Sequence, residues 1–302
     1  MGSDENAVLM RWCEEVLGRI EVLDDATREH AGNRASVLRL RTADGDYVLK
    51  RHRDGQHWHS EVHAYENWAA ACGESAPRLV AVRDEEPNAL LITALPGRPI
   101  EGRVLAPQAE RAVWRSAGGA LAKLHSLARG EYFGLCDRSG APAGSAHVDA
   151  REYMRAAFDE WIERGERIGC IHDKERTIVL RAQERIGAFA GERPSACHRD
   201  FCTANWLVTD DGAWSGMIDF EFAYWDVRTA DFSRFAEWNW IARPDLFDAL
   251  VDGYGWMIDR DQLFVSRVLY ALSAVVWGCE VSYLGFAQEG REALEILTGQ
   301  SR

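Results

Sequence analysis

Residues 198–205 read H-R-D-F-C-T-A-N, and residues 218–221 read I-D-F-E. Between these two motifs, short apolar runs lie on either side of a Thr-Asp-Asp-Gly turn signal, a pattern that predicts a β-hairpin. Such a hairpin returns Asp219 to the side of Asn205. Any fold of this chain must therefore bring Asp200, Asn205 and Asp219 together around one point.

These three side chains suit one kind of chemistry. Asp200 can accept the proton of an incoming hydroxyl group, while Asn205 offers a neutral oxygen and Asp219 a charged one. Mg²⁺ prefers oxygen ligands and usually takes one or two carboxylates together with substrate phosphates. The order and spacing are typical of enzymes that transfer phosphoryl groups from ATP. Taken alone, the first motif is equally compatible with a helix-capping Asp and a turn Asn in any protein.

A second pattern lies upstream. Residues 37–41 and 47–50 flank an Ala-Asp-Gly-Asp turn signal and predict two strands, the second ending in Lys50. Strand alternation directs Lys50 into a cleft beneath the loop at 30–34, which contains Asn33. There the ammonium group can pair with nucleotide phosphates. The alternative is an ordinary solvated lysine on an edge strand.

A lysine in that role needs a carboxylate partner. Residues 59–70 have the apolar spacing of a helix and carry two glutamates near one face. Glu61 is the candidate for the ion pair with Lys50, and Glu66 is the competitor.

With these pieces in order, the chain resembles the aminoglycoside phosphotransferase family, which is related to the choline kinases. The resemblance rests on the Gly32-Asn33 loop, Lys50, the Glu61 helix, the segments A-P-R-L-V (76–80), L-I-T-A-L-P-G (91–97) and A-L-A-K-L-H (120–125), and the two motifs above. It implies an α+β, protein-kinase-like fold of two lobes. A small N-terminal lobe holds an antiparallel sheet, and a larger C-terminal lobe is mainly helical.

The resemblance also implies roles for individual residues. Asp200 is the catalytic base, Asn205 and Asp219 hold Mg²⁺, and Lys50 contacts phosphates with Glu61 as its partner. Asn33 belongs to the nucleotide-binding loop, and backbone groups from Thr93 to Leu95 bind adenine. The chain departs from the family in two places: Arg199 stands where glycine is more common, and Cys202-Thr203-Ala204 replaces the common His-Pro-Gly.

The predicted organisation follows from composition and periodicity. Residues 1–94 form the nucleotide-binding lobe, residues 95–100 a linker rich in Pro and Gly, and residues 101–302 the helical lobe. Helices are expected at 108–127, 150–164, 174–189, 228–241, 244–256 and 261–284, and a mobile loop rich in Gly, Ala and Ser at 138–146. The longest apolar run, 269–279, is too short to cross a bilayer, so no membrane association is expected.

Charge and cysteine content limit the partners. The net charge of −13 and the lack of basic clusters disfavour nucleic acid. Residues 205–261 hold twelve Asp or Glu against four Arg, which predicts an acidic cleft that concentrates a cationic substrate. Candidate contacts are Asp226, Glu237, Glu160 and Glu280, whereas Asp231 is interpreted as a brace for the catalytic loop. Seven scattered cysteines without C-x-x-C pairs predict reduced thiols and a cytoplasmic location.

Together these observations predict transfer of the γ-phosphate of ATP or GTP to a hydroxyl group of a small cationic molecule. An aminoglycoside-type antibiotic is the leading acceptor, which would make the protein a resistance enzyme. A metabolic kinase for choline, homoserine or a methylthio-sugar is the alternative within the same fold. A kinase-like binding module without catalysis is the third possibility, which the presence of Lys50, Asp200, Asn205 and Asp219 together disfavours. Nothing in the sequence predicts the oligomeric state.

Overall fold

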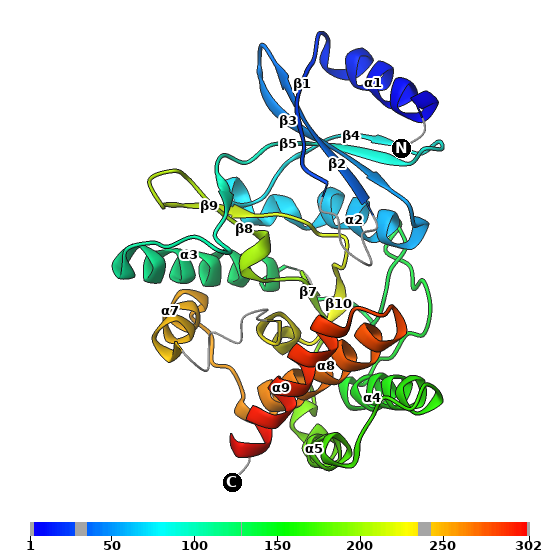
Figure 1. The fold of residues 1–302 in the computed structure, drawn as a ribbon, viewed down its shortest axis with the longest axis vertical. Coiled ribbons are helices and arrows are strands. Elements are labelled where there is room, and N and C mark those ends of the chain that lie inside the picture. The colour runs from blue at the N-terminus through cyan, green and yellow to red at the C-terminus, as the bar shows by residue number, and fades with distance from the viewer. Residues whose placement is uncertain (1–2, 28–34, 128, 235–242, 301–302) are drawn as a thin grey trace.

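The computed structural model describes residues 3–27, 35–127, 129–234 and 243–300, which form two lobes (Figure 1). The N-terminal lobe holds a five-stranded antiparallel sheet in the order β1-β2-β3-β5-β4. Its strands are β1 (Glu21–Asp25), β2 (Ala35–Thr42), β3 (Gly45–His52), β4 (Leu79–Arg83) and β5 (Ala89–Thr93). Asn33 lies outside the described residues.

Alternation along the strands gives the sheet two apolar faces. Ala89 and Leu91 of β5 pack with Leu9 of α1 (Ser3–Leu17), whereas Leu90 and Ile92 belong to the main core with α2 (Gly55–Asn67). Successive strand residues point to opposite faces, so one strand serves both helices. The α2 helix starts where the Asp54 carboxylate accepts hydrogen bonds from the backbone N–H groups of Gln56 and His57, as an N-cap does. This cap sets where α2 begins beneath the sheet.

The predicted hairpin after the first motif is confirmed. It consists of β8 (Trp206–Val208) and β9 (Trp214–Met217), and the Ile218 N–H donates to the Asn205 carbonyl at 3.0 Å. Part of the predicted linker is a strand as well, because β6 (Arg98–Pro99) pairs with β8. Gly97 makes this approach possible: it has φ +94°, and a Cβ there would lie 2.1 Å from the Val208 carbonyl oxygen.

Six helices build most of the described C-terminal lobe: α3 (Pro107–His125), α4 (Ala150–Arg167), α5 (Asp173–Glu184), α7 (Pro244–Tyr254), α8 (Arg260–Glu280) and α9 (Leu284–Gln300). The short strands β7 (Ser195–Cys197) and β10 (Tyr224–Asp226) pair with each other beside the catalytic loop. By length and composition α8 could cross a membrane, but it is largely buried in this lobe, packed against α9, α4 and α5.

Several predicted helix boundaries were wrong. The helix expected at 261–284 ends at Glu280, and a separate helix, α9, follows it because Val281–Tyr283 form a turn. The helix expected at 174–189 stops at Glu184 and continues as a 3₁₀ turn over Ile186–Phe189. Of the segment expected at 228–241, Arg228–Phe232 form a 3₁₀ helix, and residues 235–242 lie outside the described part.

The loop predicted at 138–146 reaches across to the N-terminal lobe. The Arg138 guanidinium pairs with Glu66 of α2 at 2.6 Å and with Asp84, and its carbonyl oxygen lies 3.0 Å from Nδ1 of His63. Within the loop, Asp137 accepts hydrogen bonds from the N–H groups of Ser139 and Ala141. These contacts join the loop to α2.

Close helix packing in the C-terminal lobe gives a first prediction. A Cβ at Gly118 of α3 would lie 2.0 Å from the Leu250 carbonyl oxygen of α7, whereas a Cβ at the neighbouring Gly119 would meet nothing closer than 3.7 Å. We expect Gly118→Ala to lower the free energy of unfolding by about 1–3 kcal/mol through overpacking. Gly119→Ala should be neutral or stabilise by up to about 1 kcal/mol, because alanine favours helix. Urea denaturation of both variants measures these changes in the free energy of unfolding. Equal denaturation midpoints for Gly118→Ala and Gly119→Ala would contradict the close contact at Gly118.

Candidate active site

One buried carboxylate, Asp231, holds the catalytic loop in shape. Its side chain accepts hydrogen bonds from the backbone N–H groups of His198 at 2.8 Å and Arg199 at 2.5 Å. His125 of α3 lies 2.9 Å from the same carboxylate through Nε2, and its Nδ1 contacts the Tyr254 hydroxyl at 2.8 Å. The brace expected at Asp231 is therefore present. Asp231 itself lies inside the 3₁₀ helix Arg228–Phe232.

The hydrogen bonds to Asp231 decide its charge. Burial acts to raise the pKa of this carboxyl, but the hydrogen bond and charge interaction with His125 and the contacts with His198 hold the pKa below its usual value. Asp231 is thus an anion in the folded protein. Arg199 has a positive φ of 67°, a conformation that costs a non-glycine residue free energy. The Asp231 contact at the Arg199 N–H offsets that cost.

His198 joins the two sequence motifs. Burial lowers the pKa of His198, so its ring is neutral. Nδ1 accepts a hydrogen bond from the Asp200 N–H at 3.3 Å, which leaves Nε2 to donate to the Ile218 carbonyl at 3.0 Å. The ring thereby fixes the residues that precede Asp219 relative to Asp200.

Asp200 and Asn205 are in direct contact. The Asn205 amide nitrogen donates to the Asp200 carboxylate at 2.8 Å and to its backbone carbonyl at 3.0 Å. The amide nitrogen is thus engaged by Asp200, and the amide oxygen is the atom of this side chain that a cation can bind. The second oxygen of Asp200 is ion-paired with Arg234, which the sequence interpretation had not identified.

Lys50 lies among three carboxylates. Its ammonium is 2.9 Å from Glu61, 2.5 Å from Asp219 and 3.0 Å from Glu221. Glu61 therefore forms the ion pair expected with Lys50, and Glu66 does not, because it pairs with Arg138. Glu221 was not singled out from the sequence. Its position two residues after Asp219, in a motif already recognised, was the available signal.

The charges in this cluster do not balance. Burial opposes the charge of Lys50, but Asp219, Glu61 and Glu221 hold its pKa well above the usual value. Burial, together with Asp219 and Glu61, raises the pKa of Glu221 despite Lys50. With all three carboxylates ionised, the group around the ammonium would carry a net charge of −2, an excess that one divalent cation would neutralise and that the raised pKa of Glu221 reflects. All the anionic groups are hard oxygen donors, and these fit Mg²⁺.

His52 lies on the other side of Glu61, with Nε2 2.6 Å from its carboxylate. His52, Glu61 and Glu221 are near enough to one another to hold a metal ion, but Nε2 of His52 is already engaged by the Glu61 carboxylate. The arrangement is better described as a network that orients Glu61.

The strand that precedes the linker has its N–H groups engaged. The Thr93 N–H donates to the Arg78 carbonyl and the Ala94 N–H to the Asp46 carbonyl, both at 2.9 Å. Adenine binding in this segment, as expected from Thr93 to Leu95, must then use backbone carbonyl groups or the Leu95 N–H.

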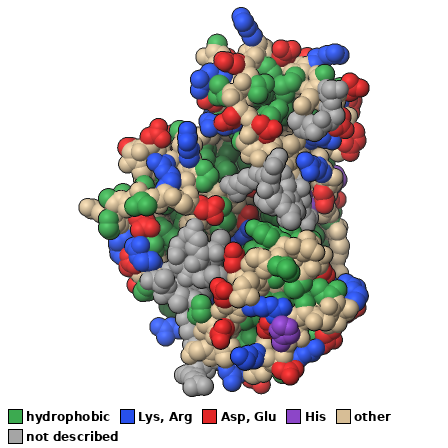
Figure 2. Space-filling model, in the orientation of Figure 1, with side chains coloured by type: hydrophobic (Ala, Val, Ile, Leu, Met, Phe, Trp, Pro, Cys, Tyr) green, Lys and Arg blue, Asp and Glu red, His purple; other side chains and the backbone are tan. Residues whose placement is uncertain are grey.

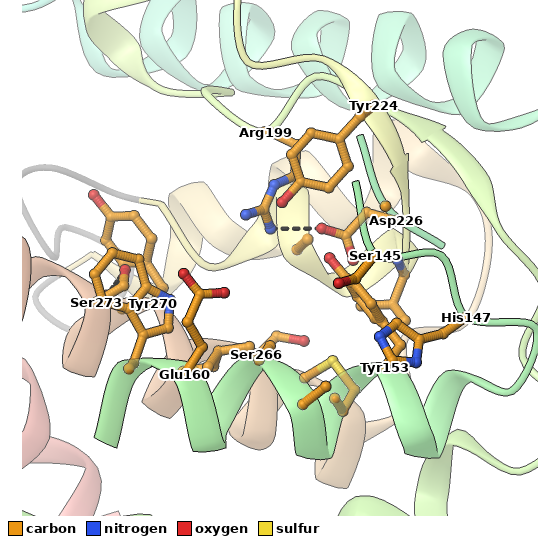
Figure 3. Close-up of a pocket in the computed structure, with 18 of the residues that line it drawn as sticks. Ser145, His147, Tyr153, Glu160, Arg199, Tyr224, Asp226, Ser266, Tyr270 and Ser273 are labelled. Atoms are coloured by element: carbon orange, nitrogen blue, oxygen red, sulfur yellow. Dashed lines mark hydrogen bonds and ion pairs between the residues drawn. The ribbon is translucent and has the colours of Figure 1, made fainter. Parts of the chain in front are cut away.

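A cavity of about 800 Å³ opens beside the catalytic loop (Figure 3). Its wall includes Arg199 and Asp226 on one side, α4 on the second and α8 on the third, with residues 134–147 closing part of the rim. Arg199, which directly precedes Asp200, and Ser233, which directly precedes the Asp200 partner Arg234, both line this cavity. The cavity therefore lies beside Asp200.

The four carboxylates predicted to contact substrate have different positions. Glu160 points from α4 into the cavity but also pairs with Arg164 at 3.1 Å. Asp226 lines the cavity and pairs with Arg199 at 2.6 Å. Glu280 is bound to Arg164 at 2.6 Å and is absent from the cavity lining among the described residues. Glu237 lies outside the described residues.

The acidity of the cavity comes from an unexpected source. Within the described part of 205–261, Asp226 is the acidic residue that lines the cavity. Others pair with distant arginines, as Asp252 does with Arg115 and Asp261 with Arg185. Acidic and basic side chains are accordingly intermixed on the face shown in Figure 2. The exposed carboxylates at the rim instead belong to α4: Asp159, Glu160 and Glu163.

The Asp231 brace gives a second prediction. Asp231→Asn removes a buried charge that accepts from two backbone N–H groups, and we expect the free energy of unfolding to fall by about 3–5 kcal/mol. The loss should shrink below about pH 4. Because the folded-state pKa is depressed, the stabilisation is complete above the unfolded-state pKa and is lost as pH falls through the folded-state value.

The measurement is urea denaturation at a series of pH values. Asp259→Asn, which removes an exposed helix N-cap carboxylate, serves as the control for a generic loss of one Asp. A pH-independent difference between wild type and Asp231→Asn would contradict the ionised brace.

Comparisons with known proteins agree with this geometry. The chain resembles three solved structures: a thermostable mutant of aminoglycoside phosphotransferase APH(4)-Ia in apo form (13% identity, TM-score 0.72, 96% of this chain and 98% of that chain covered), a gentamicin complex of APH(2")-IIa (14%, 0.61, 95% and 95%), and a GDP and kanamycin complex of APH(2")-IIia (14%, 0.68, 97% and 99%). No curated protein sequence matches. At these identities the likeness shows the fold, and the predicted two-lobed α+β fold is confirmed.

The model of the phosphotransferase enzyme family matches residues 25–264, a span that contains the Lys50 cluster, the catalytic loop and most of the cavity wall. The chain belongs to the phosphotransferase enzyme family.

Proposed function

We propose that this phosphotransferase moves the γ-phosphate of ATP or GTP to a hydroxyl group of a small cationic molecule of the aminoglycoside type. One observation carries the proposal: Asp200 lies between the Lys50 cluster and the cavity. Asp200 contacts Asn205, and Asn205 is hydrogen-bonded to the residue before Asp219. On the other side, its sequence neighbour Arg199 is part of the cavity wall.

The residues divide the work between positioning and electrostatics, as phosphoryl transfer requires. Asp200 orients the acceptor hydroxyl and takes its proton, with Asn205 holding the carboxylate in place. For this step the acceptor must displace Arg234 from Asp200. Lys50, fixed by Glu61, is positioned to pair with nucleotide phosphates. Asn205, Asp219 and Glu221 would hold Mg²⁺, which neutralises phosphate charge when bound.

The acceptor class is inferred from the cavity. A volume of about 800 Å³ suits a molecule of drug size. Asp159, Glu160 and Glu163 place negative charge at the rim, where amines of an incoming molecule would be attracted. The likeness to proteins solved with gentamicin, or with GDP and kanamycin, supports the same choice. The preference between ATP and GTP is part of the test.

The decisive experiment measures nucleoside diphosphate release with ATP or GTP across aminoglycosides, choline, homoserine and a methylthio-sugar. We expect stimulation by at least one aminoglycoside. Stimulation by a metabolite alone would replace the proposal with the metabolic kinase. No stimulation by any compound, in a protein that still binds nucleotide, would favour a binding module.

The role of Asp200 gives a third prediction. Asp200→Asn should lower acceptor-dependent turnover by about 10²–10⁴-fold, the typical contribution of a positioned base. Nucleotide affinity, measured by calorimetry, should change little. Asp210→Asn, in the exposed turn of the β8–β9 hairpin, is the control with full activity expected. Turnover within a few-fold of wild type in Asp200→Asn would refute the assignment.

The acidic rim gives a fourth prediction. In the double variant Asp159→Asn with Glu163→Gln, KM for a polyamine acceptor should rise about 2- to 10-fold, since exposed charges contribute modestly. The turnover number should remain unchanged, and the salt dependence of KM should weaken. Glu152→Gln on the same helix is the control, because Glu152 does not line the cavity. An unchanged KM and salt dependence would show that the rim does not attract the acceptor.

A further inference from the structure

Arg199 introduces a cation into a cavity whose rim is acidic. Its guanidinium forms part of the cavity lining, 2.6 Å from the Asp226 carboxylate, with its central carbon 4.6 Å from the centre of the Tyr224 ring (Figure 3). Among the described lining residues it is the single Arg or Lys. A cavity that only attracted polyamines would gain nothing from this group.

The position of Arg199 is costly to maintain. Its backbone has φ 67°, and its partner Asp226 is 1% exposed. Burial raises the pKa of Asp226 even though the Arg199 charge acts to lower it, so the pair does not recover the full cost of burying the carboxylate. Buried ion pairs often contribute little net stability. Folding stability alone is therefore a weak reason for this arrangement.

The Arg199 guanidinium has more N–H donors than its contact with Asp226 uses. One terminal nitrogen lies 2.6 Å from the Asp226 carboxylate. Among the described residues, Nε is buried without a hydrogen-bond partner. The side chain is nevertheless 32% exposed, and it borders the cavity. A guanidinium in such a place can donate strong, directional hydrogen bonds to an oxygen of a bound molecule.

The location indicates which part of the acceptor this oxygen would belong to. Asp200 is directed toward Asn205 and Arg234, whereas Arg199 forms part of the cavity wall. An acceptor whose reacting hydroxyl reaches Asp200 would therefore present a different oxygen to Arg199, on the part of the molecule that lies in the cavity. The amines would then face the opposite side, where Asp159 and Glu163 form the rim.

We propose that Arg199, held by Asp226 and Tyr224, is a specificity-determining residue that binds an oxygen of the acceptor other than the hydroxyl that is phosphorylated. This inference rests on the proposed phosphotransfer to an amine-bearing acceptor and narrows the acceptor class. The site selects polyhydroxylated amines that carry this second oxygen, and it discriminates against acceptors deoxygenated at the position that Arg199 binds.

The test uses the full-length protein and kanamycin, gentamicin and hygromycin B as probes. The double variant Arg199→Met with Asp226→Asn removes the guanidinium without leaving a buried unpaired carboxylate. Arg199→Lys keeps the positive charge but lacks the planar set of N–H donors that the guanidinium offers. Measurements are acceptor and nucleotide affinity by calorimetry, KM and turnover number, and thermal stability, each with the probes and their mono-deoxy analogues.

We expect the double variant to weaken acceptor binding and raise KM by about 10- to 100-fold, the range for a hydrogen bond to a charged group. Nucleotide affinity should stay within about 2-fold. In wild type, affinity and KM should change by a similar factor with the mono-deoxy analogue that lacks the oxygen bound by Arg199, while the double variant should not distinguish that analogue from its parent compound. The acceptor affinity and KM of Arg199→Lys should lie between those of wild type and those of the double variant.

Two results would overturn the inference. One is unchanged acceptor affinity in the double variant. The other is a parallel loss of nucleotide binding and stability with unchanged discrimination, which would mark a structural role. If wild type phosphorylates none of the probes, the proposed reaction with aminoglycosides is refuted. Calorimetry of probe binding still tests the role of Arg199 in that case. Probe binding that depends on Arg199 supports the subsite, whereas absent or Arg199-independent binding contradicts it.

Discussion

The buried Asp231 carboxylate is the constraint on which the rest of the site depends. It binds the N–H groups of His198 and Arg199 and is itself held by His125 of α3. With these N–H groups fixed, the positive φ of Arg199 turns neighbouring side chains to different sides of the loop. Asp200 then faces Asn205, while Arg199 enters the cavity wall. One anion thus sets both the candidate base and the candidate acceptor contact.

The two lobes meet through α2. Glu61 of this helix pairs with Lys50, which also contacts Asp219 and Glu221 from the other lobe. One turn further along, Glu66 pairs with Arg138 in the loop whose flanking residues line the cavity. A displacement of α2 would therefore act on the Lys50 cluster and on the cavity rim together. Individual exposed pairs such as Glu66 with Arg138 contribute little energy, so the Lys50 cluster is the stronger of these links.

What the sequence predicted well depended on local pattern. The hairpin that returns Asp219 to Asn205, and the pairing of Lys50 with Glu61, follow from short segments with clear periodicity. The electrostatic prediction holds only in part. Asp219, Glu221 and Asp226 lie at the site, but other carboxylates after Asn205 find arginines far away in sequence, as Asp252 finds Arg115. The same limit explains Arg234 and the α4 rim, whose neighbours are set by tertiary packing that no local pattern encodes.

The Lys50 cluster on one side of Asp200 and the cavity on the other both have an excess of negative charge, but the excess is buried in the first and exposed in the second. Around Lys50, three carboxylates exceed the ammonium by two negative charges in a largely buried setting, where an uncompensated excess is expensive. In the cavity, the buried Asp226 is matched by Arg199, and the excess sits on exposed α4 carboxylates that water can solvate at low cost. The first imbalance would therefore be relieved most by a bound divalent cation, whereas the second would be relieved only weakly by a cationic acceptor. Under the proposed function, we expect a strong dependence on a divalent metal and a weaker, salt-sensitive preference for a cationic acceptor.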